Sequence, residues 1–345
     1  MTAIGRGLAV ALLASLSGCA DEGAPPAPPS NPLTAAVAPA GFPTGRVTAA
    51  APPNSALTEA RARLGRRLFF DKRLSRTHTV ACASCHRPET AFAEPSAASS
   101  GVDGRRGTRN APALVNLAWA QQLFWDGRAG TLDEVAGKPI ENPDEMDLPL
   151  AEAVRRLGED PAYQQEFLEA YAGPPSEESL RQALASFVRT LVSGGTPYDR
   201  FLRGDASALD APARRGMSLF FSAKGACFHC HPSGPLTNDG FFNNGTFVAG
   251  SDPGRQAITG RTGDLGKFKV PGLRNVAVTA PYMHDGSLPT LEAVIDQYAR
   301  GGRGGPNTDA TIAPLELTVE DKADLVAFLR ALTDPVFLAD PRYRE

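Results

Sequence analysis

The sequence predicts a mainly α protein with long loops, organised as two related domains in tandem. Segments 179–192 and 319–332 carry apolar residues at helical spacing, whereas few segments show the alternation of a half-buried strand. An internal echo is the second observation, because segment 63–70 (RLGRRLFF) and segment 214–221 (RRGMSLFF) each precede a Cys-x-x-Cys-His motif. A helix, a Leu-Phe-Phe end, a loop and the same motif, used twice, indicate duplicated domains.

The first 18 residues are typical of a signal peptide. Arg6 gives a small positive region, and residues 8–16 form a short apolar stretch. Segment 16–19 (LSGC) resembles a bacterial lipobox, in which the signal is cut before Cys19 and that thiol is lipidated. A plain signal peptide cut nearby, with Cys19 incidental, is the alternative. Either reading predicts export to the periplasm, and a lipid chain would hold the protein at a membrane face.

The next elements follow in order along the chain. Residues 19–53 are rich in proline and alanine, with nine prolines after Cys19, and such a segment is expected to form a disordered tether. Thr58 is suited to cap a helix that runs through Leu64 and Phe69. The segment 194–197 (GGTP) ends the helix predicted over 179–192. We therefore expect an N-terminal domain over 54–196 and a C-terminal domain over 197–345.

Bulk composition excludes some classes of function. The chain is 42% hydrophobic and 21% charged, with a formal net charge of −3, which is ordinary for a globular protein. A nucleic-acid binder would usually show a basic stripe, so no nucleic-acid partner is expected. No apolar run is long enough for a mature membrane-spanning helix, so a lipid on Cys19 is the expected membrane contact.

Two Cys-x-x-Cys-His motifs carry the chemistry. Each motif places two thiols where they can add to the vinyl groups of a haem, and the next histidine can reach the iron. A zinc site would need both cysteine pairs to converge on one ion, and a redox dithiol has no use for the histidine. The sequence therefore predicts two covalently bound haem c groups in two cytochrome c-like domains, attached and ligated by Cys82, Cys85 and His86 and by Cys227, Cys230 and His231.

From residue 57 to residue 333, the sequence resembles the bacterial di-haem cytochrome c peroxidases and their relative MauG. The matching segments are 68–75 (LFFDKRLS), 109–112 (RNAP), 124–128 (FWDGR), 145–146 (EM), 273–276 (LRNV) and 280–286 (APYMHDG). The resemblance implies two helical haem domains with a calcium ion between them. It also implies that the first haem meets hydrogen peroxide and that the second exchanges electrons.

Three sets of residues take roles from this resemblance. Glu145 matches the family's acid–base carboxylate, although its acidic loop alone would indicate a solvated charge. Trp125 matches the tryptophan between the haems; without the match, it would be taken for a packed core aromatic. Asn110, with the carbonyls of Thr279 and Pro281, matches the calcium ligands, and a turn-stabilising asparagine is the alternative.

Two departures from the peroxidase pattern favour the MauG-like branch. Peroxidases carry a histidine in the loop before Arg109, and here Val102 occupies that position, so the first haem is expected to be five-coordinate. They also place a methionine fourteen residues after the histidine that matches His284, and here that position is Tyr298. The phenol of Tyr298 is therefore expected to ligate the second haem iron, with Met283 or His284 as the alternative ligand. Val135 replaces a glutamine of many relatives, which predicts a thinner hydrogen-bond network.

The function expected from these features is MauG-like. Hydrogen peroxide would oxidise the haem pair to a high-valent state, and the oxidising equivalents would pass to a partner protein. The alternative is a cytochrome c peroxidase that receives electrons from a small cytochrome or cupredoxin. A pure electron-transfer cytochrome is a third possibility, which the open first site and Glu145 disfavour.

Overall fold

The computed structural model describes Met1, Phe42 and residues 55–247, 250–305 and 307–345. The predicted signal peptide, the lipidation site Cys19 and the predicted tether lie outside the described residues, apart from Met1 and Phe42. Phe42 is buried, and its ring packs edge-on against Trp119 with the centroids 4.8 Å apart. The composition of the segment did not predict this contact, which buries one bulky apolar side chain of a proline-rich stretch.

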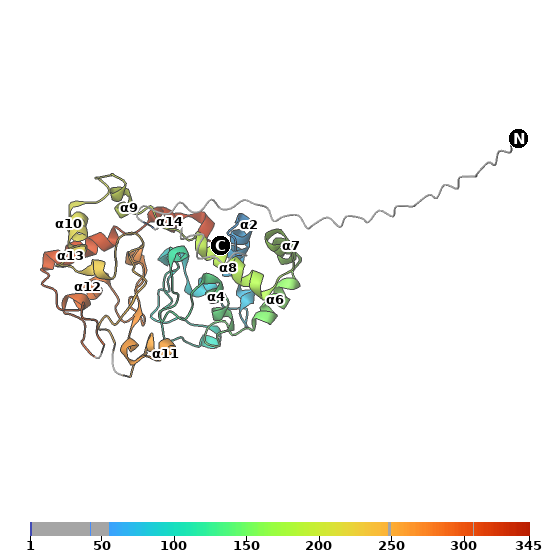
Figure 1. Ribbon diagram of the computed structural model, residues 1–345, viewed down its shortest axis with the longest axis horizontal. Helices are drawn as coiled ribbons and strands as arrows, with labels where there is room; N and C mark the ends of the chain where they lie inside the picture. Colours follow the sequence, from blue (N-terminus) through green and yellow to red (C-terminus); the bar gives the residue numbers. More distant parts are fainter. Residues whose placement is uncertain (2–41, 43–54, 248–249, 306) are drawn as a thin grey trace.

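Helices gather at the two ends of the folded body, with long loops between them (Figure 1). One end holds α2 (Glu59–Phe70), α6 (Leu150–Gly158), α7 (Pro161–Tyr171) and α8 (Glu177–Thr190). The other end holds α10 (Ala211–Phe220), α12 (Leu291–Ala299) and α13 (Val319–Arg330). The short helices are α3 (Cys82–Cys85), α4 (Leu132–Ala136), α5 (Lys138–Glu141), α9 (Pro197–Leu202), α11 (Gln256–Thr259) and α14 (Pro335–Ala339).

Strands contribute little to the described chain. β1 (Phe241–Phe242) pairs antiparallel with β2 (Phe268–Lys269). The loops carry short 3₁₀ segments, which are η1 (Lys72–Leu74), η2 (Pro88–Thr90), η3 (Val102–Gly104), η4 (Leu117–Trp119), η5 (Cys227–His229), η6 (Thr262–Asp264), η7 (Val276–Val278) and η8 (Pro341–Tyr343). The mainly α architecture with long loops is therefore confirmed.

The predicted helices form, and threonine caps mark where two of the described helices begin. Thr58 caps α2 by accepting a hydrogen bond from Arg61 N at 3.2 Å. Thr290 caps α12 in the same way, through Ala293 N at 3.2 Å. The segments predicted over 179–192 and 319–332 are α8 and α13, each ending about one half-turn earlier than expected.

A glycine marks the crossing point of each main helix pair. A Cβ added to Gly65 of α2 would lie 1.8 Å from Ala183 O of α8, and one added to Gly216 of α10 would lie 1.9 Å from Asp324 O of α13. Only glycine allows two helix backbones to approach so closely. The internal echo in the sequence is therefore a duplicated helix crossing.

The two largest apolar clusters lie on either side of Thr196, with one exception. Residues from Ala60 to Leu191 form the first cluster, and residues from Tyr198 to Leu332 form the second. The exception is Phe337 of α14, which returns to the first cluster and packs on Phe92 with the ring centroids 6.2 Å apart. The C-terminal tail thus contacts the first of the two predicted domains.

The loops between the helices repeat the duplication. Asn116 and Asn275 both have left-handed backbone conformations, with φ of 61° and 62°. Each donates its backbone N–H at 2.8 Å to a carbonyl one or two residues beyond a main helix of its own half, Leu191 O after α8 and Leu332 O after α13. The two halves therefore share loop geometry as well as the helix crossing.

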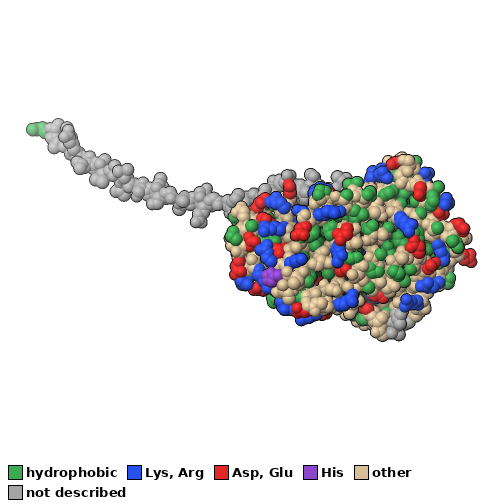
Figure 2. All heavy atoms as spheres, turned by 180° about the vertical axis from the view of Figure 1, so that it is seen from behind, with side chains coloured by type: hydrophobic (Ala, Val, Ile, Leu, Met, Phe, Trp, Pro, Cys, Tyr) green, Lys and Arg blue, Asp and Glu red, His purple; other side chains and the backbone are tan. Residues whose placement is uncertain are grey.

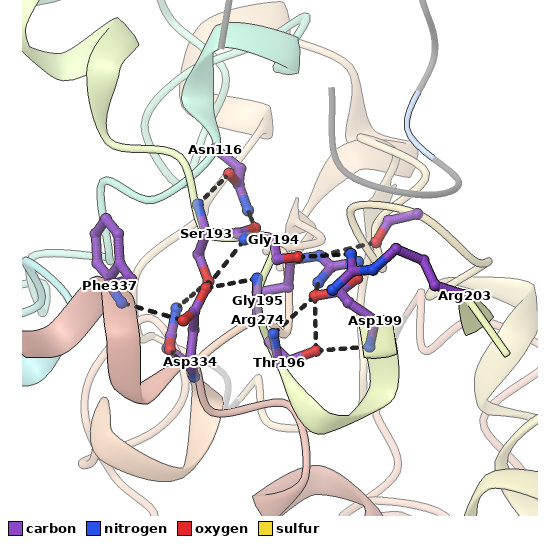
Figure 3. A network of polar contacts seen from close by, with 12 residues as sticks. Asn116, Ser193, Gly194, Gly195, Thr196, Asp199, Arg203, Arg274, Asp334 and Phe337 are labelled. Atoms are coloured by element: carbon purple, nitrogen blue, oxygen red, sulfur yellow. Dashed lines mark hydrogen bonds and ion pairs between the residues drawn. The ribbon is translucent and has the colours of Figure 1, made fainter. Parts of the chain in front are cut away.

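The segment 193–196, which joins α8 to α9, is held by buried acidic side chains (Figure 3). Asp334 is 2% exposed, and its Oδ2 accepts hydrogen bonds from Ser193 Oγ at 3.0 Å, Gly194 N at 3.0 Å and Gly195 N at 2.8 Å. These bonds fix the connection between the two halves.

On the face shown in Figure 2, basic and acidic side chains are interspersed over the folded body. This distribution agrees with the absence of a basic stripe from the sequence. Among the described residues, no helix has the length and apolar character needed to cross a membrane.

Candidate haem sites

The first Cys-x-x-Cys-His motif borders a cavity of about 290 Å³. Cys82 and Cys85 begin and end the one-turn helix α3, so both thiols leave the same short element. Burial raises the pKa of Cys82 to about 12 and that of Cys85 to about 11. The thiols are therefore protonated at neutral pH in the unmodified chain.

The two motif histidines are oriented by the same device. His86 Nδ1 lies 2.8 Å from Phe92 O, and His231 Nδ1 lies 2.7 Å from Leu236 O. A carbonyl oxygen can only accept, so Nδ1 carries the hydrogen and Nε2 keeps the free lone pair that a metal requires. Burial lowers the pKa of His86 and lowers that of His231 to about 4, which keeps both rings neutral.

The second motif is built on a different local backbone. Cys227 begins the 3₁₀ segment η5, and Cys230 follows its end. Burial raises the pKa of Cys227 to about 12 and that of Cys230 to about 11. Despite this difference, Phe220 lies 6.4 Å from the His231 ring, just as Phe69 lies 6.5 Å from the His86 ring.

Glu145 lies on the wall of the first cavity, together with Cys82 and Cys85. Burial raises the pKa of the Glu145 carboxyl, and Asn142 Nδ2 donates to its Oε1 at 2.7 Å. Asp144 and Glu141 in the same loop are exposed. The acidic loop thus sends one carboxylate inward, while its neighbours remain solvated.

The loop with Val102 lies against Glu145 through its backbone. Val102 N donates to Glu145 O at 2.8 Å, and the Val102 side chain is fully buried in the first apolar cluster. Gly101 and Val135 line the cavity, and His86 is the single histidine among its described lining residues. The other nearby histidine in the sequence, His78, is exposed.

Trp125 connects the two halves of the molecule beside the cavity. Its Nε1 donates to Asn110 O at 2.8 Å, and its backbone O accepts from Lys269 N at 2.7 Å. A matching contact joins Asn110 N to His284 O at 2.8 Å. Asn110 and Lys269 each lie six residues before the left-handed asparagine of their half, and Trp125 and His284 each lie nine residues after it. The two backbone hydrogen bonds are therefore the same contact, with the donor and acceptor halves exchanged.

The predicted calcium ligands are brought partly together. Asn110 is 5% exposed, and its Nδ2 donates to Glu94 O at 3.0 Å and Ser96 O at 2.6 Å. The hydrogen bond to His284 O brings the segment that contains Pro281 close to Asn110. Thr279 directly follows η7. Within the described residues, no group of three or more His, Cys, Asp or Glu side chains could hold a metal, and the predicted oxygen set contains none of these residue types.

Tyr298 of α12 faces the second motif. Burial raises the pKa of Tyr298 to about 12, and the nearness of Cys230 and Cys227 adds to the rise. Asn244 Nδ2 lies 3.3 Å from Tyr298 Oη and 3.2 Å from Met283 Sδ. The Tyr298 phenol and the Met283 thioether, which were predicted as alternative ligands, therefore both contact the side-chain amide of Asn244.

His284, the third alternative, occupies a different environment. Its ring stacks on Phe268 with the centroids 3.6 Å apart, and Asp285, Asp252 and Arg109 are the charged groups that act on it. Its backbone O is bound by Asn110 N. We therefore take His284 to be part of the contact between the halves.

The chemistry of these residues fits covalent haem. Each motif offers two thiols and a neutral imidazole with Nε2 free, and the first opens onto a mainly apolar cavity. In such a site, Cys82, Cys85 and His86 would hold one haem, and Cys227, Cys230 and His231 would hold the other.

Comparisons with known proteins agree with this fit. The family model of di-haem cytochrome c peroxidases matches residues 59–207, and that of RoxA-like, cytochrome c-like proteins matches residues 268–302. The methylamine utilization protein MauG of Methylorubrum extorquens is 40% identical over 84% of this chain and 83% of its own. The cytochrome c peroxidase of Escherichia coli is 39% identical over 78% of this chain and 57% of its own. The crystal structure of a MauG-like protein associated with microbial copper homeostasis has a TM-score of 0.80 and 37% identity, covering 85% of this chain and 95% of that one.

The fold and the two motifs define a c-type cytochrome with two cytochrome c-like domains. The chain belongs to the di-haem cytochrome c peroxidase and MauG family. It is thus a peroxidase-type oxidoreductase whose family implies two haem c groups, and the predictions of fold class, family and enzyme class are confirmed.

Sequence reasoning gave no role to two residues that the structure places at the sites. Asn244 follows another asparagine in a glycine-rich loop, and nothing in that pattern indicates a contact with Tyr298. Arg274 lies in the matched segment 273–276 and lines the first cavity. An arginine within a family motif was a signal in the sequence that could have directed attention to it.

Proposed function

We propose that this enzyme uses hydrogen peroxide to oxidise a partner protein, in the manner of MauG. The proposal rests mainly on Tyr298, because its phenol lies near Cys227 and Cys230 and accepts a hydrogen bond from the Asn244 amide. A methionine ligand raises a haem potential, whereas an anionic oxygen ligand holds iron ferric and favours higher oxidation states. The second site is therefore suited to share an oxidation that begins at the first.

Glu145 would handle the proton at the first site. When haem is bound there, its iron supplies the open position at which peroxide is reduced. The Glu145 carboxylate can take a proton from one peroxide oxygen and return it to the leaving oxygen. Asn142 fixes one carboxylate oxygen through its 2.7 Å hydrogen bond, which leaves the other free for the proton.

Trp125 would connect the sites. Its indole lines the first cavity, and its hydrogen bond to Asn110 O fixes the plane of the ring. Lys269 N holds its backbone from the other half. Asn110, which accepts the indole hydrogen bond, is also the residue that we propose to bind one Ca²⁺ together with the carbonyls of Thr279 and Pro281. This ion would hold the two halves in a fixed relative position.

Peroxide and the ferric holoprotein test this function directly. Mixing the two should produce a long-lived near-infrared absorption band, followed by oxidation of a tyrosine- or tryptophan-bearing partner protein. Tyr298→Met is the informative variant, because a thioether replaces the phenol at the same position. The band should be lost in that variant while both haems remain attached, and an unchanged band would contradict the proposal.

A second candidate function is reduction of peroxide with electrons from a small cytochrome or cupredoxin. Met283 Sδ favours it, because this sulfur lies as close to Asn244 as the phenol does. If Met283 ligates the second iron, the potential would be high and turnover with reduced cytochrome c would be fast. Slow turnover with a lasting near-infrared band would decide for the MauG-like function.

The working location follows from covalent haem attachment and from the predicted signal peptide. We propose that the protein acts in the periplasm and that a lipid on Cys19 holds it at a membrane. Mass spectrometry of the amino-terminal peptide from native cells would show a diacyl or triacyl cysteine. A mature amino terminus that carries no lipid and begins at a residue other than Cys19 would contradict lipidation and would indicate a plain signal peptide.

A further inference from the structure

Arg274 is a buried cation, and one nitrogen of its guanidinium has no hydrogen-bond partner among the described residues. Its side chain is 2% exposed, its Nη1 pairs with Asp199, and its Nε donates to Gly234 O at 3.1 Å. The guanidinium also lies over the Phe42 ring, 4.8 Å from the centroid. The nitrogen without a partner among the described residues is Nη2, which is itself buried. Such an N–H is costly to leave unsatisfied, so it indicates an acceptor outside the polypeptide.

The first cavity supplies the place for that acceptor. Arg274 lines the same cavity as Cys82, Cys85 and His86. The other cations on its wall already face carboxylates, since Arg109 and Arg128 lie 2.6 Å and 2.8 Å from Asp126, and Lys269 lies 2.9 Å from Asp239. Among the described lining residues, Arg274 is the cation with a buried N–H group that lacks a partner.

We propose that Arg274 binds a propionate carboxylate of the haem attached at Cys82 and Cys85. A guanidinium edge is matched in shape and charge to a carboxylate, and a haem presents carboxylates at the edge opposite its vinyl groups. The inference rests on the proposed function in one respect, which is that the first site holds covalent haem. It then follows that one half binds this haem covalently and the other half binds it by charge.

The contacts of Asp199 extend this link to the connection between the halves. Asp199 is fully buried, and its Oδ2 accepts from Thr196 N at 3.0 Å and Thr196 Oγ1 at 2.7 Å as well as from Arg274. Figure 3 shows Arg274 and Asp199 together beside Gly194, Gly195 and Thr196. A carboxylate on Arg274 would therefore join the first haem to the segment that precedes α9.

A matched pair of variants tests the proposal without leaving Asp199 as a buried, unpaired carboxylate. Asp199→Asn removes the partner and keeps the guanidinium, and Asp199→Asn with Arg274→Gln removes both charges. The two proteins differ only at Arg274. Mass spectrometry first establishes that both haems are attached, because a chain lacking the first haem would refute the proposed function instead.

Resonance Raman spectroscopy and potentiometry of the resting proteins give the readout. We expect the propionate bending bands of the first haem to shift in the double variant and not in Asp199→Asn. The potential of the first haem should fall, because a positive charge that stabilises the reduced form is lost. Replacing Arg274→Gln by Arg274→Lys in the double variant should restore much of the potential.

The loop position of Gly234 gives the propionate a second possible source. Gly234 follows His231 closely, so the second haem could present its carboxylate to Arg274 instead. Bands and potential that shift for the second haem alone would overturn the assignment to the first. Bands and potentials unchanged at both haems would overturn carboxylate binding altogether.

Discussion

The two candidate haem sites share the geometry of their histidines and differ in the residues that accompany them. On the histidine side, His86 and His231 donate to Phe92 O and Leu236 O at 2.8 Å and 2.7 Å, and a phenylalanine lies at about the same distance from each ring. Beyond the histidines the sites differ, because the first has a cavity lined by Glu145, whereas the second has Tyr298 near its cysteines. The two halves have therefore kept the hydrogen bond that orients the motif histidine and have diverged in the residues near it.

A count along the chain shows where the divergence lies. Thr131 and Thr290 cap α4 and α12, and eight residues after each cap stand Pro139 and Tyr298. Pro139 lines the first cavity, and a proline side chain has no atom that can ligate iron. Under the proposed function, this position would leave the first site open and would offer an oxygen ligand at the second.

The largest effect is expected from Glu145→Gln, which tests whether the first site is the reactive one. The amide keeps the shape of the side chain but cannot take a proton, so the rate of reaction with peroxide should fall by about 10²–10⁴-fold. Stopped-flow absorbance of the haem bands measures this rate. Glu141→Gln in the same acidic loop is the control, since Glu141 is exposed. Equal rates in the two variants would assign the chemistry to another group.

The pH profile sharpens the same point. Burial raises the pKa of Glu145, and a carboxylate acts as a base only when it is ionised. The reaction rate should therefore fall as the pH decreases through this raised pKa, at a higher pH than for an ordinary glutamate. Glu145→Gln should lose that step. A step that persists in the variant would belong to a different residue.

Gly65→Ala and Gly216→Ala test whether the helix crossings of the two halves, α2 with α8 and α10 with α13, are equivalent. Each new Cβ would meet a backbone oxygen, at 1.8 Å and 1.9 Å, so each variant should lose about 3 kcal/mol of stability or more. Gly158→Ala is the matched control, because its Cβ would meet nothing within 4 Å. Thermal unfolding followed by circular dichroism measures the difference. A much smaller loss for one of the two pairs would show that the crossings are not equivalent.

The smallest effect is expected from Asn244→Ala, which tests whether Tyr298 ligates the second haem iron. The Asn244 amide donates to Tyr298 Oη at 3.3 Å, and loss of one such bond is worth about 1 kcal/mol. A phenolic oxygen freed of this donor binds ferric iron more strongly, so the potential of the second haem should fall slightly. Gln165→Ala, at an exposed position of α7, is the control for the potentiometric titration. A rise would indicate that Met283 is the ligand.

Features local in sequence were predictable. The Cys-x-x-Cys-His spacing, the Thr58 cap and the apolar stripe of α8 each depend on neighbours a few residues away, and the structure contains all three. The resemblance directed attention to Glu145 and Trp125, and both residues line the first cavity. Their roles remain predictions.

Contacts that depend on the approach of distant segments were not predictable. Asn244 reaches Tyr298 across 54 residues, and Arg274 reaches Asp199 across 75. The packing of Phe42 on Trp119 and the return of Phe337 to the first cluster are of the same kind. No local pattern marks such pairs, because tertiary folding alone brings them together.

Electron paramagnetic resonance of the ferric holoprotein, beside its Tyr298→Phe variant, tests the difference between the two sites most directly. We predict one high-spin haem from the open first site and one low-spin haem from the second, with the low-spin signal alone changed by the substitution. Two low-spin haems, with a protein nitrogen or sulfur on the first iron, would contradict the account.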